Sequence, residues 1–301
     1  MFKCVISLVI LVMSKQNFAK NLIHYKCRGG IYPRSTVERF FVPDDKVCWK
    51  TQYDDYKPNC FNAPSLQGKP WADPDIDSPN FKPKWNMVDG KVNRSSHIGT
   101  YNIVNQLPQN PIGRTGICGR GVLGRWGPNH AADPVVTRWK RLDGKMVLDP
   151  NKKPILQFVA IKRGDSGEWA LPGGMVDPGE LDTVTAVREF REEALNSLAK
   201  TEEETAQWTE KLNTFFSTGE VVYKGYVDDW RNTDNAWLET VAYNFHDETG
   251  TIVGSMNLQA GDDAVGVCWV DITPTIKLYA SHEEIVQTVN KKQIRIFESE
   301  H

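Results

Sequence analysis

The amino-acid sequence predicts an α+β fold, in which a mixed β-sheet lies between helices and follows a smaller domain rich in loops. Two observations predict it. The second half of the chain alternates strand-like segments with helical segments whose apolar residues recur every three or four positions. The first half is interrupted by many Pro and Gly residues yet carries many aromatic side chains, which is typical of packed, irregular structure.

Composition sets the number of domains and the kind of partner. The chain has 301 residues, of which 40% are apolar and 25% charged, and its formal net charge is −2. This is typical of a globular protein with two modest domains, and it argues against a dedicated nucleic-acid binder, which would carry a basic surplus. We expect a targeting-type segment at 1–20, a loop-rich domain at 24–130 and a regular domain at 131–301.

The N-terminal segment resembles a targeting signal. Residues Cys4 to Met13 are apolar apart from Ser7, and Lys3 precedes them. Such a run is shorter than the ~20 residues that span a membrane, so no membrane span is expected in the mature chain. A basic residue before a short apolar run is typical of a secretory signal peptide, whereas a mitochondrial transit peptide is Arg-rich and no Arg precedes Arg28. The destination stays open.

The cysteines indicate neither a zinc site nor a disulfide framework. Six are present, one of them inside the apolar N-terminal run, which leaves an odd number. No C-x2-C pair occurs.

The regular domain contains the strands and helices that predict the fold class. Strands are expected at 135–140 and 155–161, on either side of an Asp143-Gly144 turn, and again at 221–226, 237–245 and 265–270. Helices are expected after a Gly-Gly motif, from a capping box at 201–204 to about Phe216, and from a capping box at 281–284. In the last helix, Ile285, Val286 and Val289 share one face.

The Gly-Gly motif carries the strongest chemical signal. Gly174 is followed after five residues by Glu180, and after seven more by Arg188 and a helix in which Glu189, Glu192 and Glu193 share one face. Three carboxylates on one helix face are most often solvated. Here a glycine turn after a strand can bring backbone carbonyls close to them, and oxygen ligands suit Mg²⁺ or Mn²⁺. The motif therefore predicts a metal site.

A second glycine pattern, G-x-G-x-x-G at 119–124, does not predict a dinucleotide site. The required fold places a strand before it and a helix after it, whereas turn-like residues precede it and Trp126-Gly127-Pro128 follows. Its arginines are suited to phosphate, so an anionic site lined by Arg114, Arg120 and Arg125 is one interpretation of this loop.

At the Gly-Gly motif the sequence resembles the Nudix hydrolase family, whose box reads G-x5-E-x7-R-E-U-x-E-E-x-G-U, where U is bulky and apolar. Every charged position matches. The sequence departs from the box at Leu195 and Asn196, which concern helix packing rather than ligands. The resemblance implies a Nudix α/β/α sandwich with a mixed sheet.

Further motifs resemble one branch of the family, the mitochondrial-type ADP-ribose pyrophosphatases, and also the ADP-ribose-binding domain of a melastatin-type cation channel. These motifs lie at 127–134, 137–139, 171–180, 193–198, 223–237 and 279–282. The resemblance implies metal-dependent hydrolysis of ADP-ribose to AMP and ribose 5-phosphate. The alternatives are an ADP-ribose sensor without catalysis and a Nudix enzyme for another nucleoside diphosphate derivative. The resemblance also implies a mitochondrial location, whereas the N-terminal segment indicates the secretory pathway.

The resemblance also implies roles for individual residues. Glu189, Glu192 and Glu193 are expected to be the catalytic metal ligands for Mg²⁺ or Mn²⁺, with the carbonyl of Gly174 as a fourth ligand. Arg188 is expected to orient the carboxylates and Glu180 to support them, and the general base is either a box glutamate or an acid outside the box such as Glu239. Contacts to the nucleotide-sugar substrate are expected from Asp133, Trp139, Asp229, Arg231, Tyr279, Ser281 and His282. We expect a monomer that binds no nucleic acid.

Overall fold

The computed structural model of the chain describes residues 24–194, 210–255, 258–261 and 264–300. The chain divides into two compact units. Unit 1 contains Met1–Asn129 and Gly225–Glu239, and unit 2 contains His130–Lys224 and Thr240–His301. The expected boundary near residue 130 separates the two units, except that the later segment Gly225–Glu239 also belongs to unit 1.

The main sheet has seven strands in the order β11-β10-β7-β14-β13, with β12 paired to β7 and β15 paired to β10. Strand β10 runs antiparallel to β7, β11 and β15. The strands are β7 (Gly127–Trp139), β10 (Leu156–Arg163), β11 (Trp169–Ala170), β12 (Gly174–Met175), β13 (Glu220–Tyr226), β14 (Ala236–Asp247) and β15 (Ala264–Asp271). A small hairpin of β8 (Arg141–Leu142) and β9 (Lys145–Met146) turns at Asp143-Gly144, as expected.

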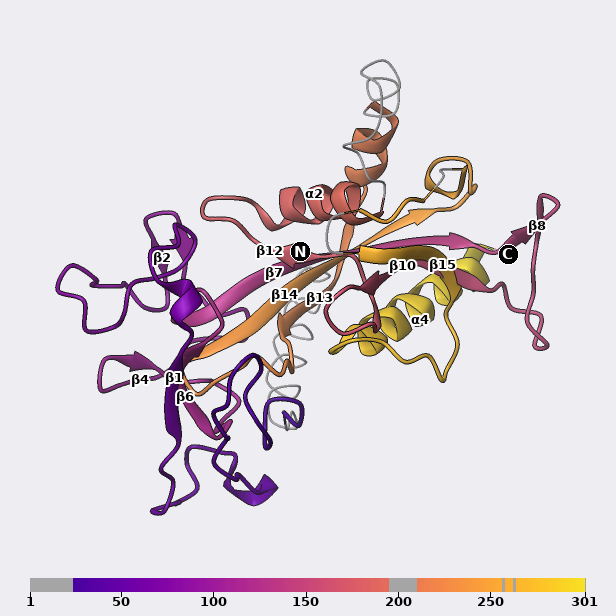
Figure 1. Cartoon of the computed structure of the whole chain (residues 1–301). Coiled ribbons are helices and arrows are strands. Elements are labelled where there is room, and N and C mark those ends of the chain that lie inside the picture. Colours follow the sequence, from indigo (N-terminus) through magenta and orange to yellow (C-terminus); the bar gives the residue numbers. More distant parts are fainter. Residues whose placement is uncertain (1–23, 195–209, 256–257, 262–263, 301) are drawn as a thin grey trace, which may run out of the picture. The chain divides into compact units, whose positions relative to one another are not determined.

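Two long helices cover the two faces of the sheet in unit 2, α2 (Asp182–Ala194) on one and α4 (His282–Glu300) on the other (Figure 1). Alternate residues of a strand point to opposite faces. Accordingly Val159 packs with Phe190 of α2, whereas its neighbour Phe158 packs with Ile285 and Val286 of α4. Residues 210–216 are also helical, and a 3-10 turn, η4, spans Val253–Ser255. The expected α/β/α sandwich is thus confirmed.

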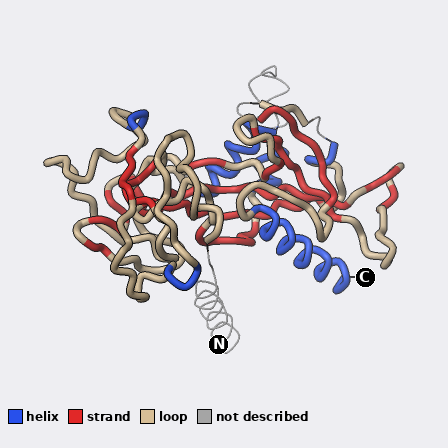
Figure 2. Tube along the Cα trace, turned by 60° about the horizontal axis from the view of Figure 1, so that its bottom comes forward, coloured by secondary structure: helices blue, strands red, loops and turns tan. Residues whose placement is uncertain are grey.

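Unit 1 is built mainly of loops and short strands (Figure 2). Strands β1 (Asn59–Asn62) and β6 (Ile117–Gly121) pair in parallel. The other short elements are η1 (Asp44–Lys46), η2 (Pro64–Leu66) and the strand pairs β2 (Val88–Asp89) with β3 (Val92–Asn93) and β4 (Ile103–Val104) with β5 (Leu107–Pro108). A core cluster of Tyr101, Tyr226 and Trp237 confirms that the aromatic residues of this region pack together.

The segment Gly225–Glu239 is bonded into unit 1 by buried polar groups. The carboxylate of Asp234 accepts hydrogen bonds from the Thr115 amide (2.8 Å), the Thr115 hydroxyl (2.8 Å) and the Tyr56 hydroxyl (2.6 Å). The Thr233 hydroxyl donates to the Gly119 carbonyl at 2.6 Å. These bonds fix residues 233–234 against β6.

One finding differs from the sequence expectations, and two expectations lie beyond the described residues. Cys60 and Cys118, directly opposed on β1 and β6, form a disulfide that the odd cysteine count did not indicate. Helix α2 begins at Asp182, so Glu180 lies two residues before it. The N-terminal segment at 1–20 and the capping box at 201–204 fall outside the described residues. Within those that are described, no helix has the length and apolar character needed to cross a membrane.

His24 is anchored in unit 1 as a neutral side chain. The hydroxyl of Tyr226 accepts hydrogen bonds from the amide groups of Asn110 (3.2 Å) and Asn232 (3.0 Å), so its own proton is directed to Nδ1 of His24, 2.8 Å away. Nε2 of His24 donates to the Arg114 carbonyl at 3.0 Å. Both ring nitrogens are therefore used by the neutral imidazole.

The burial of His24 predicts that stability depends on pH. Burial, followed by the charges of Arg28 and Arg39, lowers the pKa of His24 from 6.5 to about 3. Below pH 6.5 the unfolded chain binds a proton that the folded chain rejects, so the free energy of unfolding falls as pH drops, by at most about 1.4 kcal/mol per pH unit. Urea denaturation between pH 7 and pH 5 should show this slope, and His24→Gln should remove its contribution. Equal slopes for the two proteins would contradict the assignment.

Candidate functional site

The glycine segment of the motif is held on both sides by strands of unit 2. Before it, β11 pairs with β10, so that Ala170 lies opposite Ile161. After it, β12 pairs with β7, so that Gly174 lies opposite Ala132. The segment between β11 and β12, residues 171–173, thus has both ends fixed in the sheet.

Two glutamates of α2 meet this segment directly. The amide of Gly173 donates to Oε2 of Glu193 at 2.9 Å. A Cβ atom on Gly174 would lie 2.2 Å from Oε1 of Glu189, so only glycine brings the backbone this close to the carboxylate. The result is a pair of carboxylates set against a glycine backbone, and carboxylate oxygens are donors that Mg²⁺ and Mn²⁺ prefer. The residues present therefore fit a divalent cation.

The carboxylates are buried, and burial changes their protonation. Glu189, Glu193 and Asp133 are each less than a tenth exposed. Burial, together with the charge of Glu189, raises the pKa of Glu193 to about 8. Burial also raises the pKa of Asp133 to about 7, although a 2.7 Å hydrogen bond from the Thr240 hydroxyl opposes the shift. A divalent cation would favour the ionised form of each.

Arg188 is hydrogen-bonded to three carboxylates of the motif. Its Nε and Nη2 atoms donate to the two oxygens of Glu180 at 3.1 and 3.2 Å. Its Nη1 atom donates both to Glu189 (2.8 Å) and to Glu192 (3.1 Å). Glu180 also accepts a hydrogen bond from the Thr185 hydroxyl at 2.7 Å, so it holds Arg188 from outside the helix. The supporting roles expected for Glu180 and Arg188 stay predictions.

The start of α4 contacts the same segment. Nδ1 of His282 accepts a hydrogen bond from the Leu171 amide at 2.9 Å. The Tyr279 amide donates to the Trp169 carbonyl at 2.8 Å, and the guanidinium of Arg163 lies over the Tyr279 ring, 4.5 Å from its centroid. Unit 2 therefore brings Tyr279, Ser281 and His282 to the region of the glycine segment.

The structure contradicts the expectation that Trp139 contacts substrate. Its side chain is 2% exposed and belongs to the core beneath α4. Its Nε1 atom donates to Glu248 at 2.9 Å, and its ring packs edge-on against His246 and Phe297. With its donor bonded and its ring faces packed, Trp139 is a core residue.

Asp229 and Arg231 form a close ion pair in unit 1. The Nε and Nη2 atoms of Arg231 donate to the two oxygens of Asp229 at 2.8 and 3.0 Å. Asp229 is 1% exposed, whereas the Arg231 side chain is 31% exposed. The pair presents a guanidinium of fixed orientation to solvent.

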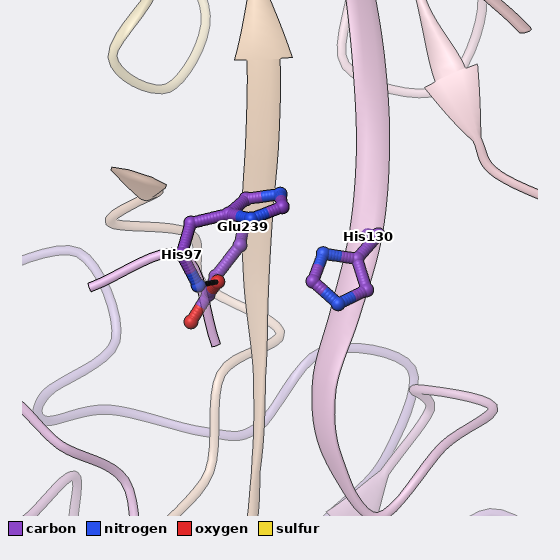
Figure 3. Close-up of side chains that lie close together, drawn as sticks. All are labelled: His97, His130 and Glu239. Atoms are coloured by element: carbon purple, nitrogen blue, oxygen red, sulfur yellow. Dashed lines mark hydrogen bonds between the residues drawn. The ribbon is translucent and has the colours of Figure 1, made fainter. Parts of the chain in front are cut away.

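Glu239, the acid outside the box that was a candidate base, lies beside His97 in unit 1 (Figure 3). Its carboxylate is fully buried and accepts hydrogen bonds from the Ser96 hydroxyl (2.6 Å), the His97 amide (2.5 Å) and Nε1 of Trp237 (2.7 Å). These bonds hold the loop at Ser96 against β14.

The interpretation of Arg114, Arg120 and Arg125 as an anionic site is wrong. Arg114 donates to three backbone carbonyls of unit 1, and its guanidinium lies over the rings of three aromatic side chains. Arg120 and Arg125 bond instead to residues 73–75, including a 2.9 Å ion pair between Arg125 and Asp73. All three are occupied within the fold.

The sequence reasoning missed two residues of this region. Thr240 bonds Asp133, and Arg163 is the basic residue whose charge acts on both Asp133 and Glu193. Neither belongs to a motif, because each reaches the site through the pairing of distant strands.

Comparison with known proteins identifies the family of the chain. The family model described as NUDIX domain matches residues 144–289, and the one described as NUDT9-like, N-terminal domain matches residues 42–127. The mitochondrial ADP-ribose pyrophosphatase of Rattus norvegicus is 54% identical over 286 residues, which cover 94% of this chain and 82% of the relative. The chain is a Nudix hydrolase. Its box departures at Leu195 and Asn196 lie outside the described residues.

Two further relatives place this Nudix hydrolase in its family. A nudix hydrolase of Caenorhabditis elegans is 44% identical over 90% of this chain and 98% of its own length. A melastatin-type channel of Nematostella vectensis, transient receptor potential cation channel subfamily M member-like 2, is 50% identical over 92% of this chain. The match covers only 18% of that channel.

The close approach of Gly174 to Glu189 predicts the effect of a single methyl group. In Gly174→Ala the added Cβ would lie 2.2 Å from Oε1 of Glu189, so the carboxylate or the backbone must move by about 1 Å. A displacement of that size in a metal site should weaken Mn²⁺ binding or turnover about 100-fold. Gly266→Ala is the matched control, because its Cβ meets only ordinary contacts at 3.5 Å or more. Mn²⁺ titration of both variants checks this, and equal affinities would contradict it.

Proposed function

We propose that this Nudix hydrolase cleaves the diphosphate of ADP-ribose to AMP and ribose 5-phosphate. Support comes from the rat relative, which is named an ADP-ribose pyrophosphatase and is similar over 94% of the chain. The observation that carries the proposal is the contact of Gly173 and Gly174 with the carboxylates of Glu193 and Glu189, because two buried carboxylates held together in this way are suited to a divalent cation.

In this proposal Glu189, Glu192 and Glu193 hold Mg²⁺ or Mn²⁺, together with the carbonyl of Gly174. The cation supplies charge that offsets the diphosphate and polarises water. The oxygen of a water molecule bonds to one phosphorus while the bridging P–O bond breaks, and the bridging oxygen leaves on the other phosphate. A carboxylate of the same cluster accepts the proton of the water. Arg188 keeps Glu189 and Glu192 in place through one shared nitrogen.

Contacts to the sugars and phosphates are proposed for Asp133, Tyr279, Ser281 and His282. They are also proposed for Asp229 and Arg231, since a guanidinium held in one orientation by a buried carboxylate is suited to a phosphate. The partner is accordingly a small nucleotide-sugar, and we propose that the protein acts as a monomer.

We also propose a mitochondrial location, because the rat relative is named mitochondrial. The secretory alternative is not supported by these relatives. Fractionation of cells that express the tagged full chain tests the choice. Recovery with a mitochondrial marker supports it, and recovery in the medium contradicts it.

Product analysis tests the proposed reaction. The full chain incubated with ADP-ribose and Mg²⁺ should release AMP and ribose 5-phosphate, and Glu192→Gln and Glu193→Gln should lower turnover at least ~100-fold because a metal ligand loses its charge. ADP-ribose binding without AMP would favour the sensor. If the protein neither binds nor cleaves ADP-ribose, the proposed substrate is wrong. NADH and dinucleoside polyphosphates would then be assayed.

Arg231→Ala tests the substrate contact in unit 1. The variant loses a charge-assisted bond to phosphate that is equally strong in the ground state and in the transition state. KM for ADP-ribose should therefore rise about 10-fold, and kcat should change little. Arg141→Ala removes an exposed arginine of the β8–β9 hairpin and serves as the control. An unchanged KM in Arg231→Ala would show that Arg231 serves only its ion pair with Asp229.

A further inference from the structure

The connection between β11 and β12 is held by side chains from two different helices. It consists of Leu171, Pro172 and Gly173, of which proline has no amide hydrogen. The Leu171 amide donates to Nδ1 of His282 at the start of α4, and the Gly173 amide donates to Oε2 of Glu193 on α2, both at 2.9 Å. Each backbone donor of the connection therefore bonds to a side chain rather than to a neighbouring strand.

The turn before α4 fixes the direction of the His282 ring. Ala280 has a φ of 49°, a left-handed conformation that is costly for a residue with a side chain. The turn is closed by a 3.1 Å bond from the His282 amide to the Tyr279 carbonyl, and the Tyr279 ring packs edge-on against the imidazole at 5.9 Å. The His282 side chain is buried, so its position is set by packing as well as by the hydrogen bond.

The hydrogen bond from Leu171 assigns separate roles to the two ring nitrogens. Because Nδ1 accepts a hydrogen bond from a backbone amide, it carries no proton itself, and the neutral imidazole has its proton on Nε2. Nδ1 therefore holds the connection, and Nε2 carries the proton that can be donated to a ligand.

We propose that His282 is a positioning residue for the metal site. By accepting the Leu171 amide it fixes the connection whose next residues, Gly173 and Gly174, meet Glu193 and Glu189. Without this acceptor the buried Leu171 amide loses its bond, and the connection is released two residues before the metal site. The inference rests on one part of the proposed function, namely that the box glutamates bind the cation.

Direct Mn²⁺ binding, measured by electron paramagnetic resonance on the full chain without nucleotide, tests the proposal. His282→Asn places its amide oxygen near the position of Nδ1, whereas His282→Gln moves its amide out toward the position of Nε2. We expect His282→Asn to bind Mn²⁺ like the unaltered protein, and His282→Gln and His282→Ala to bind about 10-fold more weakly. A role in substrate contact alone would leave the Mn²⁺ affinity of all three unchanged.

A matched control separates positioning from general loss of packing. His246→Ala also removes a partly buried histidine of unit 2, one bonded to Thr137 and Glu248, and should leave Mn²⁺ affinity unchanged. Circular dichroism establishes that each variant is folded. Unaltered affinity in His282→Gln, or equal weakening in His282→Asn and His282→Gln, would overturn the positioning role. Failure of the unaltered protein to bind Mn²⁺ would instead overturn the proposed ligand set.

Discussion

The close contact between a glycine segment and the carboxylates of α2 is the constraint on which the rest of unit 2 depends. Burying Glu189, Glu193 and Asp133 near one another is unfavourable, because each loses hydration and their charges repel. The fold offsets part of this cost with the Gly173 amide and the Thr240 hydroxyl, and part with the raised pKa of Glu193. Such an arrangement is stable only where the surrounding sheet and helices hold it, and a bound cation would stabilise it further.

The two-layered core explains how that position is maintained. Neighbouring residues of β10 face opposite helices, so the sheet fixes α2 and α4 at the same time. The segment at 171–173 then makes one hydrogen bond to each helix. A shift of either helix would therefore displace the backbone beside Glu189. This dependence links the last helix of the chain to the glutamates of α2, which lie about 90 residues earlier.

The sequence predicted well what depends on local spacing and poorly what depends on strand pairing or side-chain direction. The shared face of Glu189, Glu192 and Glu193 follows from helical periodicity, and the packing of α4 follows in the same way. No spacing rule places Thr240 beside Asp133, or Cys60 opposite Cys118, because both contacts arise from the register of distant strands. Trp139 is the reverse case, a contact that was expected and is not made. A family motif does not say whether an indole faces a ligand or the core.

The arginines of unit 1 were misread for a physical reason that applies to loop-rich folds generally. Where strands are short, many backbone carbonyls find no partner in a sheet, and a buried carbonyl without a donor is costly. A guanidinium has five donors in a fixed plane and can satisfy several carbonyls together. Arg39 does so with the carbonyls of Thr115, Trp230 and Asn232, and Arg114 with those of Lys46, Cys48 and Thr51. In such a domain a run of Gly and Arg indicates missing secondary structure as much as it indicates an anionic ligand. The number of buried backbone carbonyls that lack a donor distinguishes these two interpretations.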